Sequence, residues 1–217
     1  MHVPDVYQAR EGRQLVDVVS QHPLAALITN GPFTPFSTHL PMIPASDAEA
    51  DELVGSTLLG HMNRVNPHWS ALLAGTPAKA VFWGPNSYVT PMLYAADPSA
   101  PTWNFVSVHV EGVLRPIRDD EETFEVVRRT ASRLERLFGA GWELEGSLDY
   151  FRKIVPGVGA FTFDVHSAQG MFKLSQDKEP AIRRRIFESL EADGTGLTRE
   201  LGKAMRSFDE GGGGGSR

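Results

Sequence analysis

The chain contains no cysteine. That absence excludes disulfides, thiolate-ligated haem, cysteine-held iron–sulfur clusters, zinc–cysteine sites and cysteine nucleophiles. No apolar run approaches the ~20 residues that a membrane-spanning helix needs. The first residues also lack the basic segment followed by an apolar segment that a secretory signal has. Together these absences predict a soluble, cytoplasmic protein.

The chain also has little excess charge of either sign. It carries 21 basic and 27 acidic residues, a formal net charge of −6. Proteins that bind nucleic acid usually present a basic patch, and here only Arg183-Arg184-Arg185 stands out. There is no recognisable helix-turn-helix either. The sequence therefore disfavours a nucleic-acid partner.

Common cofactor and metal motifs are missing as well. There is no Gly-Lys-Ser/Thr phosphate loop, no Asp-rich calcium loop and no pair of histidines four residues apart on a helix. Gly157 and Gly159 form a Gly-x-Gly, but it precedes a predicted strand, so a bend in the strand is expected there. A Ser-His-Asp triad cannot be recognised from spacing alone and is disfavoured.

The segments that are present predict a mainly β fold with flanking helices (α+β). Apolar or alternating patterns predict strands at 24–29, 39–43, 57–61, 78–83 and 103–113, and a final hairpin of 157–165 with 171–174. Pro41 favours an edge position for the second strand, and Gly84-Pro85-Asn86 is expected to end the fourth. The close spacing of the strands indicates an antiparallel barrel with helices packed outside.

Helical spacing predicts the helices that accompany these strands. They are expected at 10–21, from Asn66 to Gly75, and at 120–138, 148–155, 180–192 and 196–207. Either Asp119 or Asp120 caps the 120–138 helix, and Gly139 ends it.

Two short stretches concentrate imidazole, amide and indole groups. They are Gly60–Trp69 (GHMNRVNPHW) and Pro101–His109 (PTWNFVSVH). In the first stretch Asn66 suits a helix N-cap and Pro67 suits the first turn. The N–H groups and dipole of that helix, beside Arg64, would suit a carboxylate or a phosphate. This density of polar rings predicts a site for a flat, charged cofactor.

Further candidates come from the end of the last strand and from the histidines. Lys173, Ser175 and Gln176 predict either a solvated strand end or a clamp on an anionic group. Of the seven histidines, His2, His22 and His166 are expected to be structural or surface residues, His39 is a possible pocket residue, and His61, His68 and His109 are candidate ligands.

Several motifs occur together in one order. They are Leu24–Thr29, Thr38-His39-Leu40-Pro41, Gly60-His61 with Arg64 and Asn66-Pro67, Gly84-Pro85, Tyr88-Val89-Thr90-Pro91, Pro101-Thr102-Trp103-Asn104, Val108-His109 with Gly112, and Lys173-Leu174-Ser175-Gln176. The combination resembles PaiB-type proteins of the FMN-binding split-barrel superfamily. The resemblance implies a homodimeric split β-barrel domain over 1–178, with a cofactor site at the subunit interface. A C-terminal helical extension over 179–209 and a flexible Gly-rich tail over 210–217 would follow it.

One segment departs from the usual PaiB pattern. The stretch from Met92 to Ala100 is short, has no basic residue and is followed by Phe105 in place of Tyr, which weakens the case for a flavin phosphate. This shortened form resembles the piperazate synthases, PaiB relatives that bind haem b. The resemblance implies cyclisation of N5-hydroxy-L-ornithine to L-piperazic acid, which forms an N–N bond with loss of water. The alternative is an FMN-binding oxidoreductase or a PaiB-like regulatory protein.

A haem enzyme needs one protein ligand to the iron and one open position. In a chain without cysteine we expect His61 to be that ligand, with His109 second and His68 third. Arg64, the helix capped by Asn66, and Lys173 are the candidates for the haem propionates or the substrate carboxylate, and His61, Arg64 and Lys173 form the predicted catalytic set.

The remaining predicted cofactor contacts lie in the second stretch and at the end of the last strand. They are Thr102, Trp103, Asn104, Ser175 and Gln176. Trp103 either stacks on the macrocycle or fills the barrel core. The general base that deprotonates the α-amine is open among Tyr88, Tyr94, Glu111 and Asp164.

Overall fold

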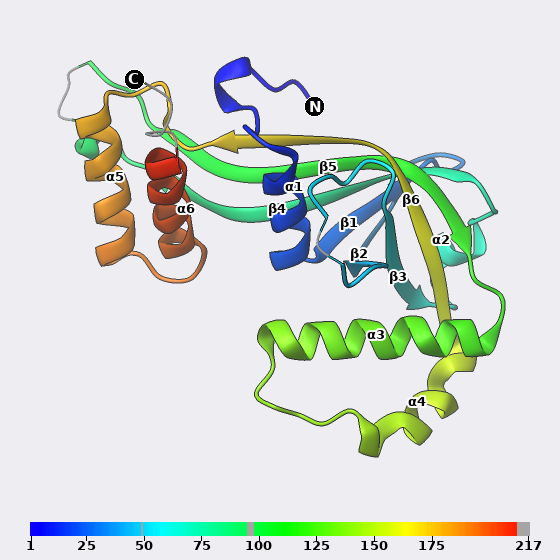
Figure 1. Cartoon of the computed structure of the whole chain (residues 1–217). Helices are drawn as coiled ribbons and strands as arrows, with labels where there is room; N and C mark the ends of the chain where they lie inside the picture. Colours follow the sequence, from blue (N-terminus) through cyan, green and yellow to red (C-terminus); the bar gives the residue numbers. More distant parts are fainter. Residues whose placement is uncertain (49, 95–97, 212–217) are drawn as a thin grey trace. The chain divides into compact units, whose positions relative to one another are not determined.

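The structure is a computed structural model that describes residues 1–48, 50–94 and 98–211. Residues 95–97 of the segment from Met92 to Ala100, and residues 212–217 of the predicted Gly-rich tail, lie outside the described residues. The described strands are β1 (Leu24–Thr29), β2 (Phe36–Pro44), β3 (Thr57–Asn63), β4 (Thr76–Val89), β5 (Thr102–Pro116) and β6 (Val158–Lys173) (Figure 1).

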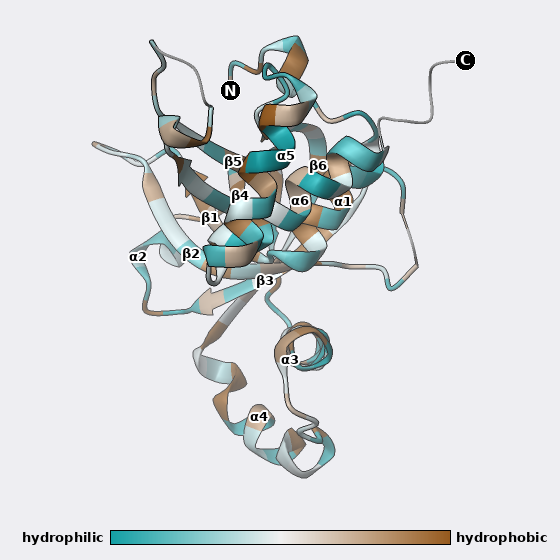
Figure 2. Cartoon of the chain, turned by 90° about the vertical axis from the view of Figure 1, so that its left-hand side faces the viewer, coloured by the Kyte–Doolittle hydropathy of each residue, from teal (hydrophilic) through white to brown (hydrophobic). Residues whose placement is uncertain are grey.

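The described helices include six α-helices and several short 3₁₀ turns. The α-helices are α1 (Gly12–Gln21), α2 (Pro67–Ser70), α3 (Asp120–Phe138), α4 (Leu148–Ile154), α5 (Pro180–Asp193) and α6 (Leu197–Gly211). The turns are η1 (Asp5–Tyr7), η2 (Pro91–Leu93), η3 (Glu145–Ser147) and η4 (Val155–Gly157). None of the described helices is long and apolar enough to cross a membrane. Figure 2 shows hydrophobic and hydrophilic residues on α3, α5 and α6 alike, as amphipathic helices require.

The strands form a closed barrel in the order β1-β2-β3-β6-β5-β4. β1 pairs antiparallel with β2 and β4, and β3 pairs antiparallel with β2 and β6. Along β5 the even-numbered residues from Asn104 to Leu114 are buried, while Trp103, Glu111 and Arg115 are exposed. The predicted fold class, a mainly β barrel with flanking helices, is confirmed.

The chain divides into two compact units, and the boundary falls within β4, β5 and β6. The barrel unit comprises Glu11–Phe82 and Val108–Gln169. The helical-pair unit comprises Met1–Arg10, Trp83–Ser107 and the described part of Gly170–Arg217, with α5 packed against α6. The division at residue 178 that the resemblance implies stays a prediction.

In the barrel unit, α3 matches its predicted limits. The Asp119 carboxylate accepts hydrogen bonds from the backbone N–H groups of Glu121 and Glu122, so Asp119 is the N-cap, and Gly139 ends the helix. α3 packs on β2 and β3, where its Val126 joins a buried cluster of Ile43, Leu59, Val126 and Ala160. The apolar stripe of α3 therefore covers the outer face of β3, the strand that carries His61.

Two strand predictions are wrong because a pairing partner overrides the local turn residues. β4 continues through Gly84-Pro85, since a Cβ at Gly84 would lie only 3.0 Å from the Cβ of Val106 and glycine permits that close approach of β5. The expected final hairpin is one strand, β6, whose polar residues 166, 167 and 169 are exposed along it rather than forming a turn.

Two smaller expectations are also wrong. The helix after Asn66 ends at Ser70, because Thr76 bonds both the N–H and the C=O of Leu73 in a turn, and Gly75, with φ +85°, lies in that turn. The strand that contains Pro41 is not an edge strand, since the barrel is closed. Pro41 is tolerated because it ends the pairing with β1, and the pairing with β3 begins one residue later.

Gly159 has a packing role that can be tested. It lies in β6 beneath Trp69, where a Cβ would fall 2.4–2.6 Å from three indole atoms. We expect Gly159→Ala to lower the free energy of unfolding by about 1–3 kcal/mol through overpacking. Gly157→Ala is the matched control, because a Cβ there meets nothing within 4 Å. Urea unfolding measures both, and equal effects of the two substitutions would contradict this assignment.

Candidate functional site

His68 is held by the fold of the barrel unit. Its side chain is 1% exposed, and its ring stacks on Phe36 with 5.2 Å between ring centroids. Nε2 lies 2.9 Å from Thr29 Oγ1, and Nδ1 lies 2.9 Å from Thr38 Oγ1. Burial lowers the pKa of this imidazole, so it is kept neutral. Both ring nitrogens are therefore engaged within the chain.

Asn66 and Arg64 are also engaged close to His68. The Asn66 side chain accepts a hydrogen bond from the His68 backbone N–H at 2.9 Å and donates to Thr38 Oγ1 at 3.2 Å, which confirms its role as N-cap. Arg64 Nε donates to the Val158 carbonyl at 2.7 Å, and Nη2 lies 3.2 Å from Asp120 Oδ1. α2 is a single turn, and the charge of Arg64 is partly balanced, so both anion-binding roles stay predictions.

His61 differs from His68. It lies on β3 opposite Ala160 of β6, and its side chain is half-buried. Its Nδ1 is buried and has no hydrogen-bond partner among the described residues. Burial lowers the pKa of His61, which favours the neutral imidazole that a metal ion requires. His61 is thus a neutral nitrogen donor without a partner in the described chain.

His109 on β5 is the other imidazole with a buried Nδ1 that lacks a partner in the described residues. Burial lowers its pKa, and the charge of Lys79 acts in the same direction. Lys79 Nζ lies 3.0 Å from Glu111 Oε1, and Ser167 Oγ lies 3.4 Å from Glu111 Oε2. The hydrogen bond from Lys79 lowers the pKa of Glu111, so this candidate base is a weak one.

In the helical-pair unit, three predicted contacts lie together. Lys173 Nζ donates to Thr102 Oγ1 at 2.6 Å, which joins β6 to β5. Trp103, next in the chain, is 54% exposed, so its alternative placement in the barrel core is wrong. Its Nε1 donates to Asn86 Oδ1 at 3.2 Å, and Tyr88 meets it edge-on with 6.5 Å between centroids. The unit thus presents a half-exposed indole, and Lys173 is held by Thr102, the residue that precedes this tryptophan in the chain.

Asn104, Ser175 and Gln176 serve the fold of the same unit. The buried Asn104 Nδ2 donates to Ser175 Oγ at 2.8 Å, and Ser175 holds a φ of 63°, unusual for a residue with a side chain. Gln176 Oε1 accepts the backbone N–H of Leu174, and Nε2 donates to the Phe172 carbonyl. These bonds account for Ser175 and Gln176, whereas the buried Asn104 Oδ1 has no hydrogen-bond partner among the described residues, and the cofactor role of all three stays a prediction.

Two of the candidate bases have distinct environments. Asp164 is bound by Arg115 at 2.8 Å and by Thr57 at 3.2 Å, and the hydrogen bond from Arg115 lowers its pKa. Tyr94 is 4% exposed, its hydroxyl has no partner in the described chain, and burial raises its pKa. No cluster of three or more His, Asp or Glu side chains suited to a metal ion occurs in the described ranges.

Thr29, Thr38 and Lys79 were missed by reasoning from sequence. Thr29 and Thr38 lie 39 and 30 residues from His68, so no local pattern connects them. Lys79 lies in an apolar strand, where its position gives no sign of Glu111 on the neighbouring strand.

Three imidazoles, the buried His68 and the half-buried His61 and His109, make the stability of the fold depend on pH. Because burial lowers the pKa values of His61, His68 and His109 below the ordinary value of 6.5, the unfolded chain binds protons more readily than the folded one. Their contribution to stability is complete above about pH 6.5 and falls as the pH drops below it. Urea unfolding between about pH 7 and pH 5 should show a steady decline, whereas Asp164 and Glu111 contribute losses only below about pH 5. A midpoint that stays constant over this range would contradict the expectation.

A family model described as "Putative FMN-binding domain" matches residues 1–167. The chain belongs to this FMN-binding family. A Bacillus subtilis relative in sequence, "Protease synthase and sporulation protein PAI 2", is 22% identical over 214 residues, which cover 94% of this chain and 96% of the relative. The predicted resemblance to PaiB-type proteins is thereby confirmed.

Solved structures share the fold of this family member. The "FAD and Heme binding protein" of Mycobacterium smegmatis aligns with a TM-score of 0.53 and 15% identity, covering 77% of this chain and 73% of that one. The flavocytochrome Anf3 of Azotobacter vinelandii aligns with a TM-score of 0.52 and 17% identity, covering 75% of this chain and 68% of that one. At these identities the likeness establishes the split-barrel fold alone.

Proposed function

We propose that this chain binds haem b through His61 and is a piperazate synthase that converts N5-hydroxy-L-ornithine to L-piperazic acid. The observation that carries the proposal is the His61 imidazole, whose buried Nδ1 has no partner among the described residues and whose pKa is lowered by burial. A neutral imidazole is the usual protein ligand of haem iron. His68, in contrast, has both nitrogens engaged.

The comparisons support a prosthetic group of this class. The Mycobacterium smegmatis protein is a binding protein for both FAD and heme, and the Azotobacter vinelandii protein is a flavocytochrome. The same fold therefore accommodates a tetrapyrrole in relatives of this architecture. The proposal includes a homodimer, as the resemblance to PaiB-type proteins implies.

The reaction needs acid–base help from the chain's own residues. The α-nitrogen of the substrate bonds to N5 while the N5–O bond breaks, the α-nitrogen loses a proton, and the hydroxyl departs as water. When bound, the haem iron would supply a Lewis acid for the hydroxylamine. The proton on the α-nitrogen requires a base, which stays open among Tyr88, Tyr94, Glu111 and Asp164. Glu111 and Asp164 are ion-paired within the barrel unit.

The second candidate function is an FMN-binding oxidoreductase, and the family match supports it more directly than it supports the haem enzyme. The exposed Trp103 offers a flat face for an isoalloxazine ring, and Lys173 offers a cation for a phosphate. A PaiB-like regulatory role would use the same fold. These candidates differ in the cofactor they require.

Cofactor titration distinguishes the two functions. The purified protein is divided, one portion is titrated with haem b and the other with FMN, and absorption spectra are recorded after removal of unbound cofactor. We expect an intense violet band that saturates at one haem per chain, and no retained flavin. Retention of FMN with no retained haem would overturn the haem proposal in favour of the second candidate. Retention of neither cofactor would overturn both.

A further inference from the structure

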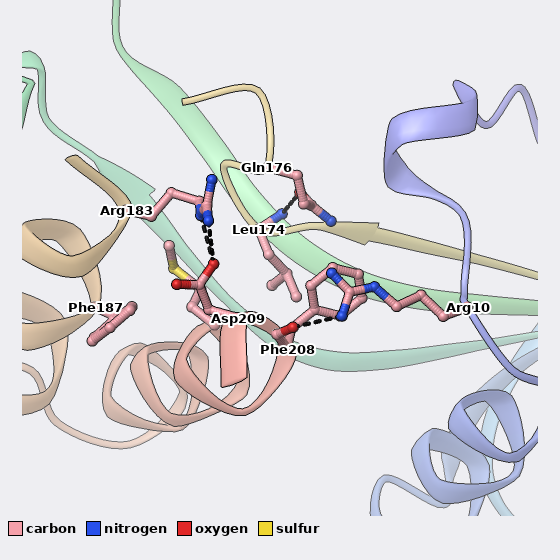
Figure 3. Close-up of a pocket in the computed structure, with 8 residues that line it drawn as sticks. Arg10, Leu174, Gln176, Arg183, Phe187, Phe208 and Asp209 are labelled. Atoms are coloured by element: carbon pink, nitrogen blue, oxygen red, sulfur yellow. Dashed lines mark hydrogen bonds and ion pairs between the residues drawn. The ribbon is translucent and has the colours of Figure 1, made fainter. Parts of the chain in front are cut away.

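A small cavity lies in the helical-pair unit, built mostly from residues beyond the part that the family model matches. Its volume is about 110 Å³. It is lined by Arg10, Leu174, Gln176, Arg183, Phe187, Met205, Phe208 and Asp209. Figure 3 draws these side chains, which come from α5, α6, the segment that follows β6 and the N-terminal segment. Only Arg10 belongs to residues 1–167.

The floor of the cavity is apolar and its rim is charged. Leu174, Phe187 and Met205 are each less than 5% exposed. At the rim, the Arg10 guanidinium lies 3.7 Å from the centroid of the Phe208 ring, and its Nη1 donates to the Phe208 carbonyl at 2.7 Å. The rim cation is therefore held in place by a backbone carbonyl and an aromatic face.

Arg183 provides the second cation. Its Nε donates to Asp209 Oδ1 at 2.7 Å, its Nη2 pairs with the same carboxylate, and its Nη1 donates to the Lys178 carbonyl at 2.8 Å (Figure 3). These contacts use three of its five N–H groups and leave two without an acceptor among the described residues. The charged side chains that line the cavity are thus two guanidinium groups and one carboxylate.

We propose that this cavity binds a short aliphatic carboxylate. The carboxylate group would pair with Arg10 and Arg183, for which planar guanidinium groups are well suited. The alkyl chain would lie on Leu174, Phe187 and Met205. The volume sets the size, since an engineered cavity of ~150 Å³ holds benzene and this one is somewhat smaller. A molecule of the size of propionate fits these limits.

The test uses the full chain and propionate as the probe. Methyl-labelled methionine gives a simple NMR spectrum because the chain has six methionines, and Met205 is assigned through Met205→Leu. We expect propionate to shift the Met205 methyl resonance saturably, and propionamide, its neutral isostere, to leave it in place. No saturable shift with propionate, or an equal shift with propionamide, would overturn the proposal.

Three variants locate the binding. Arg10→Gln is expected to weaken propionate binding about tenfold or more, because a charge-assisted hydrogen bond is lost. Asp209→Asn is expected to tighten it by roughly threefold or more, since the competing negative charge is removed, a gain that a merely loosened cavity would not produce. Arg184→Gln, on the same helix as Arg183 but outside the lining, is the matched control and should change binding by less than about twofold. Undiminished binding in Arg10→Gln, or weaker binding in Asp209→Asn, would contradict the assignment.

Discussion

Replacing His61 with alanine is expected to abolish the retained haem absorption of the reconstituted protein. The imidazole is the one proposed bond between the protein and the iron, and its loss should weaken haem binding by at least about 100-fold, given that loss of an outer-shell partner alone costs ~10–100-fold. The measurement is haem titration followed by removal of unbound cofactor. Added free imidazole should restore part of the violet band in this variant, because it supplies the missing ligand.

Two other histidines of the barrel unit serve as controls for His61. His109→Ala removes the second imidazole with a buried Nδ1 that lacks a partner in the described residues, and His166→Ala removes an exposed one. Both variants should keep the haem spectrum. If His61→Ala keeps its spectrum while His109→Ala loses it, the iron ligand is His109 and the present assignment is wrong.

Replacing His68 with alanine should destabilise the fold. The side chain is 1% exposed and bonds two hydroxyls, so the substitution leaves a void, removes the partner of the buried Thr29 hydroxyl and leaves the half-buried Thr38 hydroxyl with Asn66 alone. We expect the free energy of unfolding to fall by about 3–5 kcal/mol, combining the loss of a buried ring with unsatisfied polar groups. Urea unfolding of the wild type and the variant measures the difference.

His166→Ala serves as the control for His68, since its side chain is exposed and its removal should cost less than about 0.5 kcal/mol. Thr38→Val gives an intermediate case, because it removes one partner of His68 while leaving the ring. We expect it to cost about 1–3 kcal/mol. If His68→Ala were as stable as His166→Ala, the ring would not be a structural element, and its place among the iron ligands would have to be reconsidered.

The fold could be predicted wherever short-range patterns decide it. β1 has the predicted limits because Leu24–Thr29 is a short apolar run bounded by Pro23 and by Asn30-Gly31. α3 was predicted from its apolar spacing, its Asp119 cap and Gly139. β6 and the second half of β4 could not be predicted in the same way. Their polar and turn-forming residues lie within strands because the neighbouring strands supply the pairing.

For the candidate site, too, local patterns identify the residues, and contacts between distant strands decide what each residue does. His61 and His68 lie close together in one polar stretch, and the sequence ranks His61 above His68 as a ligand without showing whether the nitrogens of either are engaged. In the structure Thr29 and Thr38, which come from β1 and β2, occupy both nitrogens of His68. Trp103 likewise had two predicted placements, and only the outward orientation of its side chain on β5 excludes the core. Contacts between distant strands are not encoded in any local spacing.

The most direct test of the central proposal is turnover of N5-hydroxy-L-ornithine by the haem-loaded protein. Product is detected by mass spectrometry and compared with authentic L-piperazic acid, with FMN-loaded protein and haem-loaded His61→Ala in parallel. We predict a product lighter than the substrate by one water in the haem-loaded wild type alone. No product from the haem-loaded wild type, or equal product from the FMN-loaded protein, would contradict a haem-dependent piperazate synthase.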